Sequence, residues 1–174
     1  LSEVRFASTK PSSATRSGYS GSNDSAIKTL AEINLEDIPR ITTGTKEFDR
    51  VLGGGLVTGS VVLIRGNPGS GKSTLLLQVL CYLAEHNSAL YVTGEESLQQ
   101  VALRAKRLGL AADKLQMLSE TNVEQLCLTA HKIKPKIIVV DSIQVMHLAE
   151  VQSSPGSVAQ VRESAAYLTR FAKQ

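Results

Sequence analysis

The sequence predicts an α/β protein built on a parallel sheet with helices on both faces. Two short, wholly apolar runs, residues 61–64 and 137–140, have the composition of strands buried on both sides. Stretches with helical periodicity lie between and after them. A glycine-rich segment follows the first run and leads into a helical pattern. This strand–loop–helix order, with strands alternating with helices, indicates a sheet covered on both faces.

The first 30 residues differ in composition from the rest of the chain. Eight of the first 25 residues are Ser, and large apolar residues are few. Such a stretch buries too little apolar surface to offset the entropy that is lost on ordering. We therefore predict a disordered Ser-rich linker or tail over residues 1–30 and one folded domain over residues 31–174.

The elements of the folded part follow in a regular order. A short helix is predicted over residues 45–52, where three consecutive glycines end it. Residues 149–157 are rich in small polar residues and are predicted to form an exposed loop. The remaining predicted elements are the strands at 61–64, 89–93, 115–118 and 137–140 and the helices at 73–85, 97–108, 122–133 and 158–171.

The segment from Gly66 to Ser73 fits the pattern G-x-x-x-x-G-K-[ST] of a phosphate-binding loop. Its glycines let the backbone N–H groups point at phosphate oxygens beside the positive end of the next helix. Lys72 would neutralise the β- and γ-phosphates and thereby act in catalysis, and the Ser73 hydroxyl would bind Mg²⁺. A turn that binds nothing is the alternative, which the flanking elements disfavour. The predicted ATP-binding residues are Gly66, Asn67, Pro68, Gly69, Ser70, Gly71, Lys72, Ser73 and Thr74.

Hydrolysis of ATP also needs a metal-orienting acid and a group that activates water. Asp141 ends the second apolar run, at the edge of the sheet where parallel strands bind ligands. We interpret it as a metal-site residue that holds Mg²⁺ through water, beside Ser73, and capping of the helix or turn before Ser142 is the alternative. Glu95 and Glu96 follow the preceding strand and reach the same edge. From the residues alone, either glutamate is the general base, or both are first-turn acids of the next helix.

Composition limits the partners. The net charge is +3, of which residues 1–30 supply +2, so the folded part is nearly neutral and any DNA surface must come from local patches or from an assembly. One such patch is a basic cluster on the 97–108 helix, which is either a solvated face or a contact with DNA or another subunit (Arg104, Lys106, Arg107). The chain has two cysteines, no apolar run of membrane-spanning length and no signal-peptide pattern. These features favour a cytoplasmic protein without a membrane partner.

Further motifs resemble those of the RecA-like ATPases. The stretch from Thr43 to Ser60 has the spacing of Thr-Gly-Thr, Phe-Asp and Leu-Gly-Gly-Gly-Leu that precedes the phosphate loop in that group. Four more segments narrow the resemblance to the bacterial RadA (Sms) family of DNA repair and recombination proteins, and it covers roughly residues 30–174. These segments are residues 91–97, 104–110, 141–144 and 154–163.

The resemblance implies a RecA-type P-loop NTPase core. It also implies that the protein is an ATP-dependent DNA motor, that is, a DNA-dependent ATPase of helicase type, which acts in recombination, branch migration and repair. It implies ATP and Mg²⁺ as cofactors, single-stranded or branched DNA as partner, and a homohexameric ring with ATP between subunits. It assigns the general base to Glu95 rather than Glu96. The loop from Asp141 to about Gly156 matches the region that lines the DNA channel of such rings.

The chain also departs from the family pattern. The family's N-terminal four-cysteine zinc finger, and with it zinc, is absent, as are its Lys-Asn-Arg-Phe-Gly motif and Lon-protease-like domain. The strand that the family places between the phosphate-loop strand and the strand before Asp141 comes later in sequence and is also absent. We therefore expect a partial core, incomplete at the C-terminus. Two other functions stay open, a RecA-fold ATPase that acts on proteins and a non-catalytic nucleotide-binding fragment.

Overall fold

The computed structural model describes residues 29–32 and 38–174. The chain forms two units, residues 1–33 and residues 34–174. In the first unit a short 3₁₀ helix, η1, spans Leu30–Glu32, and the Glu32 carboxylate accepts a hydrogen bond from the Thr29 backbone N–H at 2.9 Å. The predicted tail over residues 1–30 lies almost entirely outside the described residues, so it stays a prediction.

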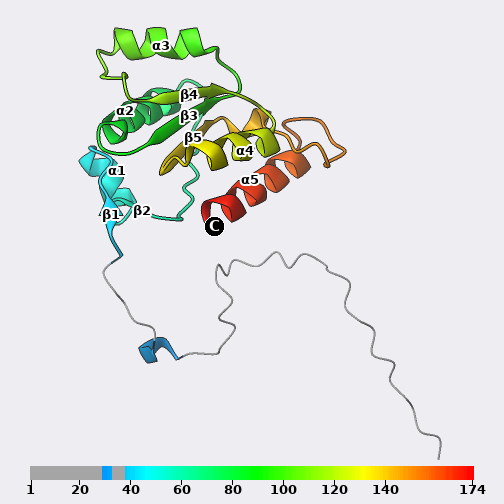
Figure 1. Ribbon diagram of the computed structural model, residues 1–174, viewed down its shortest axis with the longest axis horizontal. Helices are drawn as coiled ribbons and strands as arrows, with labels where there is room; N and C mark the ends of the chain where they lie inside the picture. The colour runs from blue at the N-terminus through cyan, green and yellow to red at the C-terminus, as the bar shows by residue number, and fades with distance from the viewer. Residues whose placement is uncertain (1–28, 33–37) are drawn as a thin grey trace, which may run out of the picture. The chain divides into compact units, whose positions relative to one another are not determined.

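A three-stranded parallel sheet organises the second unit (Figure 1). Its strand order is β4–β3–β5, with β3 (Ala89–Thr93) between β4 (Gln116–Ser119) and β5 (Ile137–Asp141). The register sets Thr93 directly opposite Asp141. Because β3 and β5 end at the same level, the residues that follow them share one edge of the sheet.

Helices cover both faces of this sheet, as the sequence predicts. Alternate residues of β3 belong to two separate cores, with Ala89 and Tyr91 in one and Leu90 and Val92 in the other. None of the described helices combines the length and apolar character needed to cross a membrane. The first core packs against α2 (Lys72–Ala84) and α3 (Leu98–Arg107), and the second against α4 (Val123–Ile133) and α5 (Val158–Ala172).

Local capping explains where these helices begin. Ser97 and Gln100 form a reciprocal capping box at the start of α3, with hydrogen bonds of 3.2 and 2.8 Å. The side chains of Asn122 and Ser157 accept hydrogen bonds from backbone N–H groups in the first turns of α4 and α5. All three helices therefore begin within a residue or so of where the sequence predicts them.

The predicted strand over residues 61–64 is wrong. The run has no regular secondary structure, and Val61, Val62 and Leu63 are 52%, 42% and 79% exposed. A strand is held by hydrogen bonds to a neighbouring backbone, and none of the strands among the described residues pairs with this run. β5 lies at the edge of the sheet, so one side of its backbone is also unpaired.

The segment before this run forms a small substructure. β1 (Arg40–Ile41) pairs with β2 (Leu56–Val57) in an antiparallel sheet, and α1 (Lys46–Val51) connects them. Asp49 of α1 fixes the turn before its own helix, because its carboxylate accepts hydrogen bonds from the Thr42 hydroxyl at 2.5 Å and from the backbone N–H and hydroxyl of Thr43 at 2.8 and 2.7 Å.

Candidate functional site

The phosphate loop is exposed and leads directly into α2. Gly69 and Gly71 have φ values of +77° and +82°, in the left-handed region that favours glycine. Gly71 is the N-cap residue of α2, so the unpaired N–H groups of the first helical turn open onto the loop. This local geometry suits a bound anion, because N–H donors and the positive end of the helix point the same way.

Lys72, the first residue of α2, folds back along the loop. Its ammonium group donates hydrogen bonds to the carbonyl oxygens of Gly66 and Asn67 at 2.8 and 2.9 Å. Ser73 and Thr74 follow in the first helical turn and are half-buried. The structure thus gathers the positive charge and the hydroxyl groups predicted for phosphate and metal binding at one helix end.

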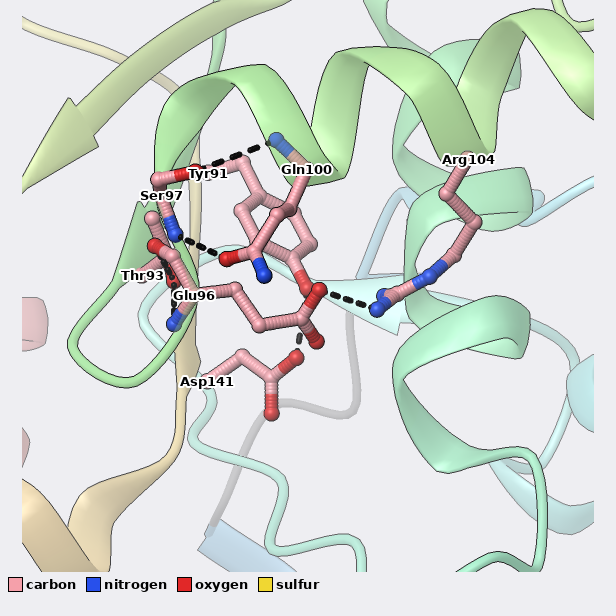
Figure 2. Close-up of polar contacts among 7 residues, drawn as sticks. All are labelled: Tyr91, Thr93, Glu96, Ser97, Gln100, Arg104 and Asp141. Carbon is pink, nitrogen blue, oxygen red and sulfur yellow. Dashed lines mark hydrogen bonds and ion pairs between the residues drawn. The ribbon is translucent and has the colours of Figure 1, made fainter.

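Asp141 is the last residue of β5, and its carboxylate has a buried partner. Alternation along the strand places it on the same face as Val139, which packs against the core under α2. The Tyr91 hydroxyl donates to Oδ2 of Asp141 at 2.5 Å (Figure 2). Burial of the Tyr91 ring, with this hydrogen bond as a further cause, raises the pKa of its hydroxyl well above the usual value. Tyr91 therefore remains a proton donor to Asp141.

Glu95 and Glu96, which the residues alone leave equivalent, have different partners. Ser142, joined to Asp141 by a cis peptide bond, donates its hydroxyl to Oε1 of Glu95 at 2.6 Å, and Glu95 is exposed. Glu96 is half-buried and forms a hydrogen-bonded ion pair with Arg104 (Figure 2). This bond raises the pKa of the Arg104 guanidinium above its usual value. Arg104 is therefore part of this edge and not of a solvated basic face.

The turn after β3 is held in place by close packing. The Gly94 N–H donates to the backbone carbonyl of Asp141 at 3.1 Å, and a Cβ at Gly94 would lie 2.4 Å from Cγ2 of Val145. The Thr93 hydroxyl donates to the Glu96 carbonyl at 2.8 Å and accepts from its N–H at 3.1 Å. Glycine is needed here because the segment after β5 approaches so closely, and the turn fixes where both glutamates start.

The acids and hydroxyls suit Mg²⁺ better than a metal held by protein ligands alone. The described residues contain no group of three or more His, Cys, Asp or Glu able to hold a metal ion. Mg²⁺ is commonly bound through one or two protein oxygens together with substrate phosphates and water. Asp141 fits that pattern, because none of the hydrogen bonds among the described residues uses its Oδ1 atom. Likewise, no hydrogen bond among them joins Lys72 or Ser73 to Asp141.

Three residues of this edge were not predicted as site residues: Tyr91, Ser142 and Arg104. For Tyr91 a signal was present, because it is the one aromatic residue of the strand, its ring carries a polar hydroxyl, and it lies two positions before the strand end. Arg104 lies two helical turns beyond the Ser97 cap, which brings its long side chain back over the turn that carries Glu96.

The parallel sheet, the loop at the start of α2 and the acids at the strand ends define a P-loop ATPase domain of the RecA type. In agreement with this class, residues 41–126 match the family described as ATPase: KaiC.

Over almost its whole length the chain is similar to the bacterial DNA repair protein RadA. It is 65% identical to the protein of Haemophilus influenzae over 174 residues, which cover 99% of this chain and 38% of that protein. The identity to the protein of Escherichia coli strain K12 is 64%, with the same coverage. For Bacillus subtilis strain 168 it is 50%, over 83% of this chain and 32% of that protein. The resemblance predicted from the motifs is confirmed, and the chain spans about 38% of the length of the two most similar of these relatives.

Proposed function

We propose that this chain forms the ATP-binding part of a DNA-dependent ATPase that acts in DNA recombination and repair. One observation carries the proposal: the phosphate loop opens α2, while Asp141 and Glu95 lie at neighbouring strand ends of the sheet that α2 covers. ATP supplies the bond that is hydrolysed, and Mg²⁺ neutralises charge on its phosphates.

Each residue then has a defined task. The backbone N–H groups of the loop over residues 66–71, which Pro68 lacks, bind the phosphates, and Lys72 exchanges its two loop carbonyls for phosphate oxygens. The Ser73 hydroxyl and the Asp141 carboxylate hold Mg²⁺. Glu95 takes a proton from the attacking water, and the Ser142 hydroxyl orients its carboxylate.

The ion pair with Arg104 is the reason to assign the general base to Glu95 and not to Glu96. The Glu96 carboxylate is held by the Arg104 guanidinium, and this ion pair would have to break before Glu96 could turn to an attacking water. Glu95 has only a neutral hydroxyl partner and is exposed, so water can reach it.

The similarity to RadA supports single-stranded or branched DNA as partner, branch migration as activity and a homohexamer as assembly. The buried side chain of Gln160, in α5, holds the proposed DNA-facing loop after Asp141 by its backbone. It accepts a hydrogen bond from the Leu148 N–H at 3.0 Å. It donates to the carbonyls of Leu148, Val151 and Ser153 at 3.3, 2.9 and 2.9 Å. This gives the loop a defined shape on which DNA contacts can be built.

A second candidate is a RecA-fold ATPase that acts on proteins, which the match of residues 41–126 to the family described as ATPase: KaiC does not distinguish from the first. The two are separated by ATP turnover of the full-length protein, measured with and without single-stranded DNA. We expect DNA to stimulate turnover, Lys72→Ala to abolish it, and Lys132→Ala, at an exposed position of α4, to leave it unchanged. Turnover that ignores DNA would favour the protein-directed candidate, and absence of turnover would leave a nucleotide-binding module.

A further inference from the structure

We infer that Tyr91 is a positioning residue of the metal site, whose buried hydroxyl fixes the Asp141 carboxylate and leaves Oδ1 for the cation. The inference rests on the proposed function, because it takes Asp141 to be a Mg²⁺ ligand. It adds a residue that touches neither nucleotide nor metal and acts through its hydrogen bond to Oδ2.

Packing alone does not explain a tyrosine at this position. Tyr91 is 0% exposed, and its ring lies in the core between β3, α2 and α3. A phenylalanine ring would fill the same space, whereas a buried hydroxyl is costly unless it is hydrogen-bonded. The Tyr91 hydroxyl meets this requirement by donating to Asp141 at 2.5 Å, so its one hydrogen bond goes to a carboxylate of the candidate site.

The sheet register explains how a core residue reaches the site. Tyr91 lies opposite Val139 of β5, two residues before Asp141, and all three are on the face that α2 covers. The Tyr91 side chain thus extends along the sheet toward the strand end, and Figure 2 shows its hydroxyl beside both the Asp141 carboxylate and the Glu96–Arg104 pair.

This contact restricts a torsion that is otherwise loose. The carboxylate torsion of an aspartate is broad and roughly two-fold, so an unpartnered Asp141 would rotate freely at the strand end. A hydrogen bond from a ring that the core immobilises selects one orientation and distinguishes the two oxygens. Partners that orient a metal ligand in this way typically change metal affinity by about 10- to 100-fold when they are removed.

The test measures how much Mg²⁺ the full-length protein needs to bind a fluorescent ATP analogue. Tyr91→Phe keeps the ring and removes the hydroxyl, so we expect the half-maximal Mg²⁺ concentration to rise about tenfold. Analogue binding in EDTA should not change, because the phosphate loop is untouched. Tyr167→Phe, a half-buried α5 tyrosine in the opposite core, is the matched control and should behave as the unsubstituted protein.

Asp141→Asn and the double variant test whether Tyr91 acts through Asp141. The double variant should need no more Mg²⁺ than Asp141→Asn alone, since the hydroxyl then has no metal ligand to position. If Asp141→Asn changes the Mg²⁺ requirement and Tyr91→Phe does not, the inference is wrong and the proposed function survives. If Asp141→Asn has no effect, both are wrong.

A second measurement covers the case in which Tyr91→Phe does not fold, as judged by thermal unfolding without ligands. In the unsubstituted protein, Mn²⁺ added with nucleotide should broaden the NMR signals of labelled Tyr91 far more than those of Tyr167. Equal broadening of the two rings would place the cation away from the Tyr91–Asp141 contact and overturn the inference.

Discussion

Replacing Glu95 or Glu96 by Gln, one at a time, should affect two different properties: Glu95→Gln should lower ATP turnover, and Glu96→Gln should lower the stability of the fold. Glutamine has nearly the size of glutamate, so Glu95→Gln still accepts the Ser142 hydrogen bond through its amide oxygen and loses only the ability to take a proton. Glu96→Gln instead leaves the Arg104 guanidinium, with 18% of its side chain exposed, without its charged partner.

The effect expected for Glu95→Gln is a loss of turnover, whereas the effect expected for Glu96→Gln is a loss of unfolding free energy. Loss of a general base lowers turnover by about 10²- to 10⁴-fold, equivalent to about 3–5 kcal/mol of activation free energy. The Glu96–Arg104 pair, with side chains 31% and 18% exposed, lies between surface pairs worth about 0–1 kcal/mol and buried pairs that cost about 3–5 kcal/mol to break. We therefore expect Glu96→Gln to lower the unfolding free energy by about 1–2 kcal/mol and Tm by about 2–8 °C.

The assays are phosphate release at saturating ATP and Mg²⁺, and thermal unfolding without nucleotide. Glu95→Gln should bind the nucleotide and hardly turn it over, with an unchanged Tm, while Glu96→Gln should unfold earlier and keep most of its turnover. The control is Glu163→Gln, which removes an exposed pair with Arg162 and should change neither quantity. Loss of turnover in Glu96→Gln with normal turnover in Glu95→Gln would refute the assignment.

Three further expectations concern the surrounding fold. The hydrogen bond from the Thr42 hydroxyl, with those from Thr43, lowers the pKa of Asp49 below 3.8. The ionised Asp49 should therefore stabilise the folded protein fully above pH 3.8, and this stabilisation should be lost as the pH falls through the lower folded-state pKa. In Asp49→Asn, the unfolding free energy measured against pH should lack this loss on the acid side. Burial raises the pKa of the Cys127 thiol to about 11, so alkylation near pH 8 should be slow until denaturant exposes it, and fast alkylation of native protein would contradict this. Gln160→Ala should speed proteolytic cleavage within residues 148–157, because it removes the side-chain bonds to that loop, whereas Gln152→Ala, at an exposed position of the loop, should not.

The sequence predicted well those elements whose start and end are set by residues close by in the chain. α3 begins after Ser97 and ends before Gly109, as predicted, because the capping box and a left-handed glycine are local signals. The run at 61–64 has an equally strong strand composition, yet it forms no strand, because pairing depends on a neighbour elsewhere in the chain. Composition indicates that a segment suits a buried strand, but it does not supply the neighbouring backbone.

In the candidate site, too, the features set by local sequence were predicted and those set by distant residues were not. The rule that ligands bind at the carboxyl ends of parallel strands predicted this edge for Asp141 and for the Glu95–Glu96 pair, and only the family resemblance singled out Glu95. The donors that hold these acids come from positions that the rule does not cover: Tyr91 lies inside the strand, and Arg104 lies in the second turn of the next helix. Their roles depend on sheet register and helix packing, which are set by the tertiary fold.

The contacts at this edge leave a charge imbalance that bears on function. The three acids Asp141, Glu95 and Glu96 lie at this edge, and like charges in one region repel one another. Arg104 compensates Glu96, but the Tyr91 and Ser142 hydroxyls orient Asp141 and Glu95 without neutralising them. The proposed function supplies a compensating charge, a divalent cation at Asp141, which would also bring the phosphates held by the loop toward Glu95. Nucleotide with Mg²⁺ should therefore raise Tm more than nucleotide with EDTA, and this difference should vanish in Asp141→Asn, because the variant removes the uncompensated charge that attracts the cation.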